Sequence, residues 1–222
     1  VLIEGAEEVI AREPYDVRTS IRLAEMLQER ARQNPELFKR IEEILRNAIK
    51  KAPKRQELYY HLAFSLAGQE RQKESVETAR YAVELSPRVA RSHYYLALMM
   101  AFQKNASKEE IMRELAIAEE LDPKFNSFQQ GDMESMMLIY KSMGNLPKIA
   151  ELITKSLRKE SERGFATREY YEYALGYYLG IRDAEKAKEV AIFLKEIASM
   201  KEDMEVLIDL LDKKAWDIIK KL

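Results

Sequence analysis

The sequence contains no cysteine and little glycine or proline, and these shortages narrow the possible architectures. Without cysteine the chain forms neither disulfide bonds nor thiolate metal sites, and cysteine-based catalysis is excluded. The 222 residues include 7 glycines and 6 prolines, where average usage would give roughly 15 and 11. Few chain-breaking residues among many Leu, Ala, Glu, Lys and Arg predict an all-α protein.

The chain also lacks an excess of basic or acidic residues. Lys and Arg number 37 against 38 Asp and Glu, so the formal net charge is −1. Proteins that bind nucleic acid usually carry a marked basic excess, and nucleic acid is therefore not expected as a partner. No run approaches the ~20 apolar residues of a membrane span, and no signal peptide is visible. The chain begins at Val1 rather than Met, which fits an excised domain or a processed product.

Four prolines divide the chain at nearly regular intervals. Pro14, Pro53, Pro87 and Pro123 are 39, 34 and 36 residues apart. Each follows a short segment of helical pattern. Proline cannot continue the helix that it follows, but it can begin the next one. Between prolines the apolar residues follow a helical period that breaks once, so each interval predicts two helices. A period of this length indicates a repeat architecture.

The second and third intervals carry similar motifs, YYHLAF at 59–64 and HYYLAL at 93–98. An aromatic side chain early in the first helix precedes a Leu-Ala pair, and a small residue stands late in the second helix. The residues in question are Tyr59, Leu62, Ala63 and Ala82, with counterparts His93, Leu96, Ala97 and Ala118. Small residues at such places let neighbouring helices approach closely. This pattern resembles the tetratricopeptide repeat (TPR), a helix–turn–helix unit of about 34 residues.

The resemblance implies an all-α, TPR-like α-solenoid of about five helix–turn–helix pairs, forming a single superhelical domain over 1–222. The repeats are expected at 16–53, 54–87, 88–123, 127–161 and 167–200, after an N-terminal helix at about 2–12. A final helix at about 202–221 is expected to close the array within 202–222, because a solenoid end needs a cap with one polar side. A membrane-surface helix or a partner-helix surface is the alternative for this segment, with Trp216 at its exposed edge.

Residues that could perform catalysis or hold a metal are few. The two histidines, His61 and His93, stand at different repeat positions. The sequence has no HExxH pair, phosphate-binding glycine loop or Gly-x-Ser-x-Gly motif. Acidic pairs such as Glu109-Glu110 are interspersed with Lys and Arg, as on a solvated helix face. The sequence therefore predicts no enzyme activity, no catalytic residue, no metal site and no cofactor.

The TPR resemblance implies a concave face, lined by the first helix of each pair, that holds an extended peptide or a partner helix. Tyr60, His61 and Phe64 are expected to point toward this groove, while Tyr59 and Leu62 face the interior. Tyr173 and Tyr177 are expected to be the equivalents of Tyr60 and Phe64 in the last repeat. The full set of expected partner-binding residues is Tyr60, His61, Phe64, Arg91, Tyr94, Leu98, Tyr173 and Tyr177.

Two interpretations stay open for Tyr60 and Phe64. They contact a ligand, since surfaces of aromatic residues and Arg often anchor interfaces, or they fill the space against the neighbouring first helix. TPRs that grip the C-terminal carboxylate of chaperone tails use paired Lys and Asn at these groove positions. The positions here hold Ile21, Glu25, Tyr60, Phe64, Tyr94 and Leu98. An apolar or mixed ligand is therefore expected, namely a partner helix, a proline-containing peptide or a glycan stacked on tyrosines.

A second resemblance concerns the setting of the chain. The stretches APKRQELYYHLAFSLAGQ (52–69) and LSPRVARSHYYLALMMAF (85–102) are similar to TPR tails of bacterial O-antigen ligase and polymerase-like membrane proteins. This resemblance implies a soluble, extracytoplasmic tail, periplasmic or on the cell surface, whose glycosyl transfer takes place in a membrane portion. The other interpretation is a non-catalytic protein-interaction scaffold, which as a stand-alone protein would be cytoplasmic.

Overall fold

The computed structural model describes residues 16–31, 33–128, 130–157, 168–197 and 201–220. Within these ranges the chain forms twelve α-helices and no β-strand. None of the helices in the described part is both long and apolar enough to cross a membrane. The N-terminal helix predicted at about 2–12 lies outside the described residues.

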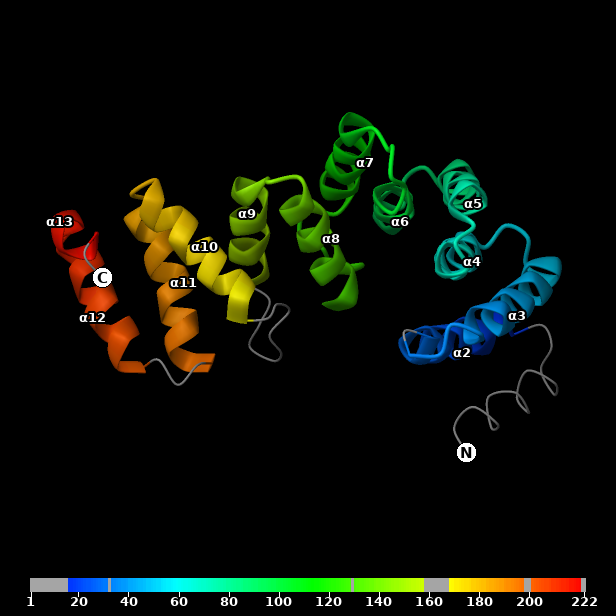
Figure 1. Cartoon of the computed structure of the whole chain (residues 1–222), viewed down its shortest axis with the longest axis horizontal. Helices are drawn as coiled ribbons and strands as arrows, with labels where there is room; N and C mark the ends of the chain where they lie inside the picture. The colour runs from blue at the N-terminus through cyan, green and yellow to red at the C-terminus, as the bar shows by residue number, and fades with distance from the viewer. Residues whose placement is uncertain (1–15, 32, 129, 158–167, 198–200, 221–222) are drawn as a thin grey trace. The chain divides into compact units, whose positions relative to one another are not determined.

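Five helix pairs follow one another along the chain (Figure 1). The pairs are α2 (Val17–Ala31) with α3 (Leu37–Lys51), α4 (Gln56–Gly68) with α5 (Gln72–Leu85), α6 (Ala90–Ala101) with α7 (Lys108–Leu121), α8 (Gln130–Ser142) with α9 (Leu146–Leu157), and α10 (Arg168–Gly180) with α11 (Ala184–Ile197). Each pair lies within one of the five ranges expected from the sequence. Two further helices follow, α12 (Lys201–Asp212) and α13 (Trp216–Ile219).

The chain divides into two compact units, Val1–Ser127 and Phe128–Leu222. In the first unit each helix from α2 to α7 packs on the next, and α4 also packs on the first helices α2 and α6. In the second unit each helix from α8 to α13 packs on the next, and the second helices α9 and α11 are also in contact. A single superhelical domain over the whole chain stays a prediction.

The core of the first unit forms where α2, α3 and α4 meet. Apolar residues at helical spacing supply it, among them Leu23, Leu27, Ile41, Leu45 and Leu66, all almost completely buried. Burying a Leu or Ile side chain stabilises the fold by about 1.5–3 kcal/mol. The α3–α4 contact is tight, because a Cβ added at Gly68 would lie 2.5 Å from the Phe38 ring.

The turn inside the pair has one geometry in α4–α5, α8–α9 and α10–α11. Its left-handed residues are Glu70, Gly144 and Arg182, with φ of 61°, 69° and 59°. In each turn the residue after the left-handed one donates its N–H to the carbonyl oxygen five positions earlier. These bonds run from Arg71 to Leu66 at 3.0 Å, from Asn145 to Tyr140 at 2.9 Å and from Asp183 to Tyr178 at 2.9 Å. This is the Schellman arrangement of a helix C-terminus. The acceptors of these bonds hold the same position in their helix pairs, at Leu66, Tyr140 and Tyr178. Any other residue of these first helices is matched by its number of positions before the acceptor.

The final helix predicted at about 202–221 is two helices. α12 packs on α11 and buries Met204, Leu207 and Leu211 of the predicted apolar face. Lys214 then has a φ of 50°, which ends the helix before α13. Trp216, expected at an exposed edge, is half-buried. The apolar pattern continues through the break, which is why periodicity alone predicted one helix.

Candidate functional site

Aromatic side chains of the first unit fill the face that the sequence predicted to be a groove. Tyr60 on α4 and Tyr95 on α6 stack with 4.6 Å between ring centroids and 18° between planes. The Arg91 guanidinium carbon lies 5.6 and 5.7 Å from these two ring centroids, within cation–π range. Tyr94 meets the Tyr95 ring edge-on at 5.1 Å. The three tyrosines are all buried.

Four residues predicted to face a groove are buried within the chain. They are Tyr60, His61, Tyr94 and Leu98. For Tyr60, which stacks on Tyr95 of α6, this agrees with the second interpretation, in which it fills the space against the neighbouring first helix. The i, i+4 spacing that marks a groove face is also the spacing with which a first helix packs on its neighbours, and α4 packs on both α2 and α6. Phe64 is half-buried beside Phe38, with 6.3 Å between centroids, and Arg91 is also half-buried. A role for these six residues in partner binding stays a prediction.

His61 is a neutral interior residue. Its Nε2 lies 3.5 Å from Oε1 of Glu25, and its backbone carbonyl accepts a hydrogen bond of 3.3 Å from the Gln28 side chain. Its Nδ1 is buried and has no hydrogen-bond partner among the described residues. Burial, and then the positive charge of Arg91, lower the pKa of His61 to about 3. At pH 7 the contact with Glu25 is therefore not an ion pair, and the imidazole is out of reach of a substrate in solvent.

Tyr59 and His93, which the sequence identified as counterparts, have the same structural role. The Tyr59 hydroxyl donates to the Pro53 carbonyl oxygen at 2.7 Å, and His93 Nε2 donates to the Pro87 carbonyl oxygen at 3.0 Å. Each bond joins a first helix to the proline that precedes it. His93 Nδ1 also lies 2.7 Å from Oε2 of Glu114 on α7. Both side chains thus fasten the connection between successive helix pairs.

One position that is buried on a first helix of the first unit is exposed on a first helix of the second unit. Since Tyr178 is equivalent to Leu66, Tyr173 takes the place of His61 and not, as the sequence comparison predicted, that of Tyr60. Tyr173 is 39% exposed, and Nζ of Lys141 on α8 lies 4.9 Å from its ring centroid.

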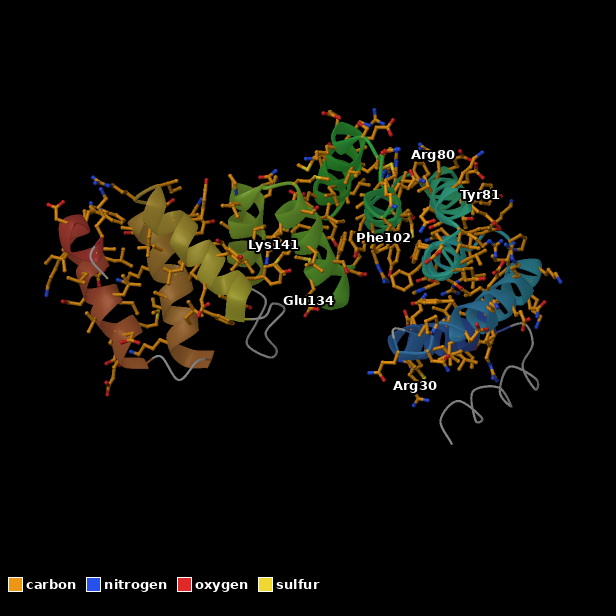
Figure 2. All side chains as sticks on the ribbon, in the orientation of Figure 1. Arg30, Arg80, Tyr81, Phe102, Glu134 and Lys141 are labelled. Atoms are coloured by element: carbon orange, nitrogen blue, oxygen red, sulfur yellow. The ribbon has the colours of Figure 1, made fainter. Side chains whose placement is uncertain are left out.

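One turn before Lys141, Leu138 is 55% exposed. Figure 2 shows Glu134 and Lys141 on α8. We call the set Glu134, Leu138, Lys141, Tyr173 and Tyr177 the α8–α10 face; Tyr177 is half-buried against Tyr178. Sequence reasoning missed Lys141, although its i+3 spacing from Leu138 places it on the same face.

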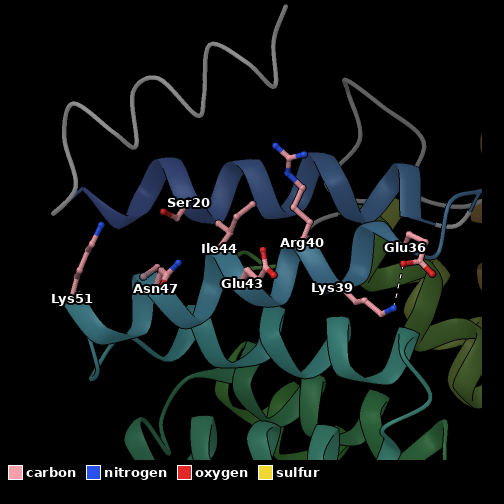
Figure 3. Close-up of a pocket in the computed structure, with 9 residues that line it drawn as sticks. Ser20, Glu36, Lys39, Arg40, Glu43, Ile44, Asn47 and Lys51 are labelled. Atoms are coloured by element: carbon pink, nitrogen blue, oxygen red, sulfur yellow. Dashed lines mark hydrogen bonds and ion pairs between the residues drawn. The ribbon is translucent and has the colours of Figure 1, made fainter.

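Hollows on the surface that the described residues of the first unit form include the following two. One, of about 530 Å³, lies along α2 and α3 and mixes both charge signs, as in the pair between Lys39 and Glu36 at 3.3 Å (Figure 3). The other, of about 440 Å³, lies among α3, α4 and α5, beside the edge-on pair of Tyr59 and Tyr81 at 4.9 Å. In the part of the chain that the structure describes, no group of three or more His, Asp or Glu side chains is placed to hold a metal ion.

Comparison with known proteins identifies the fold. No protein-family model matches the sequence, and no curated protein matches it. Among solved structures, a thermophilic TPR protein from Thermus thermophilus is similar, with a TM-score of 0.53 and 18% identity over 87% of this chain and 97% of the other. The resemblance to O-antigen ligase tails is not shown by these comparisons and stays a prediction. The likeness in structure, together with the five helix pairs, shows that the chain has an all-α, TPR-like solenoid fold.

Proposed function

We propose that the chain is a non-catalytic interaction scaffold that holds a protein ligand on the α8–α10 face. A TPR-like fold favours a protein partner, since stacked helix pairs offer extended binding surfaces. The observation that carries the proposal is the exposure of Leu138 and Tyr173 on first helices. Of the equivalents of these residues in the first unit, His61 is buried and Phe64 is half-buried.

The chemistry of the face indicates the class of ligand. Leu138, Tyr173 and Tyr177 offer apolar and aromatic surface, and Lys141 adds a positive charge beside the Tyr173 ring. Aromatic residues next to a cation are frequent anchors of interfaces. The fitting ligand is an extended peptide or an amphipathic helix that presents an apolar side chain close to a carboxylate. This class of ligand is narrower than the apolar or mixed ligand expected from the sequence.

Selection from a library of random peptides displayed on phage tests the proposal. The immobilised 222-residue chain should select peptides with an apolar residue near Asp or Glu. Leu138→Ala combined with Tyr173→Ala should weaken their binding about tenfold or more, which corresponds to a loss of about 1.4 kcal/mol. Ile192→Ala, at an exposed apolar residue of α11, is the matched control and should leave binding unchanged.

Helical circular dichroism should be the same in both variants, because all three side chains are on the surface. Selected peptides that bind the double variant as tightly as the original chain would contradict the proposal. A substrate turnover that disappears only when His61 and His93 are replaced together would contradict its non-catalytic part.

A further inference from the structure

The side chains around the α8–α10 face indicate the conformation of the ligand that it holds. An extended ligand has unpaired N–H and C=O groups, and burying them without a hydrogen-bond partner is costly. Side-chain amides can pair with both groups, because they donate and accept, but neither α10 nor residues 131–142 of α8 include Asn or Gln. The hydroxyls of Ser135 and Ser142 donate to carbonyls of α8 itself. A helix satisfies its own backbone groups and therefore fits this face better than an extended peptide.

α8 and α10 are joined by side chains rather than by close backbone packing. Among the described residues no Cα atom of α8 lies within 8 Å of one of α10, whereas α4 approaches both α2 and α6 that closely. Across this wider spacing, Nζ of Lys141 lies 4.9 Å from the Tyr173 ring centroid. Leu138 and Tyr173 stay exposed, so a third helix laid along α8 and α10 contacts one residue on each of them.

Charges along α8 indicate the direction of such a helix. Glu134 and Lys141 are seven residues apart, about 10.5 Å along the helix axis, and Leu138 lies between them (Figure 2). A ligand helix antiparallel to α8 meets Lys141 with an acidic residue, Leu138 with an apolar residue three positions later and Glu134 with a basic residue four positions after that. These three positions share one face of a helix. The acidic residue then lies toward the N-terminus of the ligand and the basic residue toward its C-terminus, an order that the helix dipole favours.

We propose that the ligand of the α8–α10 face is an amphipathic helix that lies antiparallel to α8. Its contact face presents an acidic, an apolar and a basic residue at positions i, i+3 and i+7. The apolar residue packs between Leu138 and Tyr173, and the acidic residue pairs with Lys141 beside the Tyr173 ring. This inference rests on the proposed function and narrows its ligand to one conformation, one direction and one order of charges.

Two peptide libraries displayed on phage, each of about 18 residues or five helical turns, test the conformation. One has a helix-forming background of Ala, Glu and Lys with one face randomised, and the other is random with proline at its centre. The immobilised 222-residue chain should select peptides from the helical library. Their binding should weaken about tenfold or more for Leu138→Ala with Tyr173→Ala, and also when proline replaces a central residue on the solvent face of the peptide. Serine at that place is the matched control and should weaken binding less than about threefold.

A charge swap tests the direction and the order of charges. Lys141→Glu should weaken binding of the selected peptides about threefold to tenfold at low salt, and a peptide whose acidic residue is replaced by Lys should recover binding to this variant. Lys104→Glu, at an exposed residue between α6 and α7, is the matched control and should bind like the original chain. Peptides with the three contact residues in the reverse order, basic residue first, should bind about threefold or more weakly.

Peptides that need Leu138 and Tyr173 but tolerate the central proline would overturn this inference and leave the proposed function in place. Equal binding of the two orders of charge would overturn it as well. If neither library yields peptides that need Leu138 and Tyr173, the proposed function fails together with this inference. Unchanged helical circular dichroism of each variant chain shows that weaker binding does not come from unfolding.

Discussion

His61 on α4 and Tyr173 on α10 hold the same position in their helix pairs, but one is buried and the other is 39% exposed. Around His61, Glu25 and Gln28 approach from α2 and Tyr95 from α6. Around Tyr173, Lys141 from α8 lies over one side of the ring. The repeat position thus decides where a residue lies, and the side chains of neighbouring helices decide whether that place is interior or surface.

Replacing an aromatic residue on each side of this comparison should give the largest contrast. Tyr60→Ala removes a fully buried ring that stacks on Tyr95, and it should lower the free energy of unfolding by about 3–5 kcal/mol. Tyr173→Ala removes a half-solvated ring, and it should change that free energy by less than about 1 kcal/mol.

Urea unfolding followed by circular dichroism measures both variants. Transitions are best compared at their midpoints, because repeat arrays can unfold in more than one step. Equal, small losses in the two variants would mean that the Tyr60 ring is not part of a packed interior. The large loss also means that Tyr60→Ala cannot test ligand binding by itself.

The next largest effect concerns the buried His61, whose titration should make the stability of the chain depend on pH. The His61 pKa of about 3 in the folded chain lies below the ordinary 6.5, so the unfolded chain binds the extra proton between these values. Stability should therefore fall as the pH falls from about 6.5 toward 3, with about 2 kcal/mol lost at pH 5.

His61→Leu removes this part of the pH dependence, and the difference between the two unfolding curves isolates it. Leucine also removes the unpartnered Nδ1, so the variant should not lose stability through a missing hydrogen bond. Parallel curves for the two chains between pH 7 and 5 would show that the imidazole is solvated.

The helix pairs were predictable from the sequence because proline and the apolar period mark them locally. Pro53 and Pro87 precede helices, and the Leu-Ala pairs at 62–63 and 96–97 are buried as the small-residue argument requires. The burial of Tyr60 was not predictable in the same way. A groove face and a packed face have the same helical spacing, and the choice depends on residues of α2 and α6 far along the chain.

Two smaller errors also have local causes. Leu175-Gly176 looks like the Leu-Ala pair of the last repeat, but the turn at Arg182 makes Ala174-Leu175 its equivalent and shifts Tyr173 by one position. The break at Lys214 has no glycine to mark it, although lysine there adopts a left-handed conformation. In both cases the correct assignment follows from the geometry of the turn and not from the helical period.

The smallest contrast concerns a glycine at the end of a first helix, where Gly68 and Gly180 are equivalent. A Cβ at Gly68 meets the Phe38 ring at 2.5 Å, while a Cβ at Gly180 meets nothing within 4 Å. Gly68→Ala should cost about 1–3 kcal/mol through overpacking, and Gly180→Ala should stabilise by up to about 1 kcal/mol through helix propensity. Thermal unfolding of both variants measures the difference. If both alanine variants are more stable than the original chain, the Phe38 ring has room to turn aside. The close α3–α4 contact then does not require glycine at position 68.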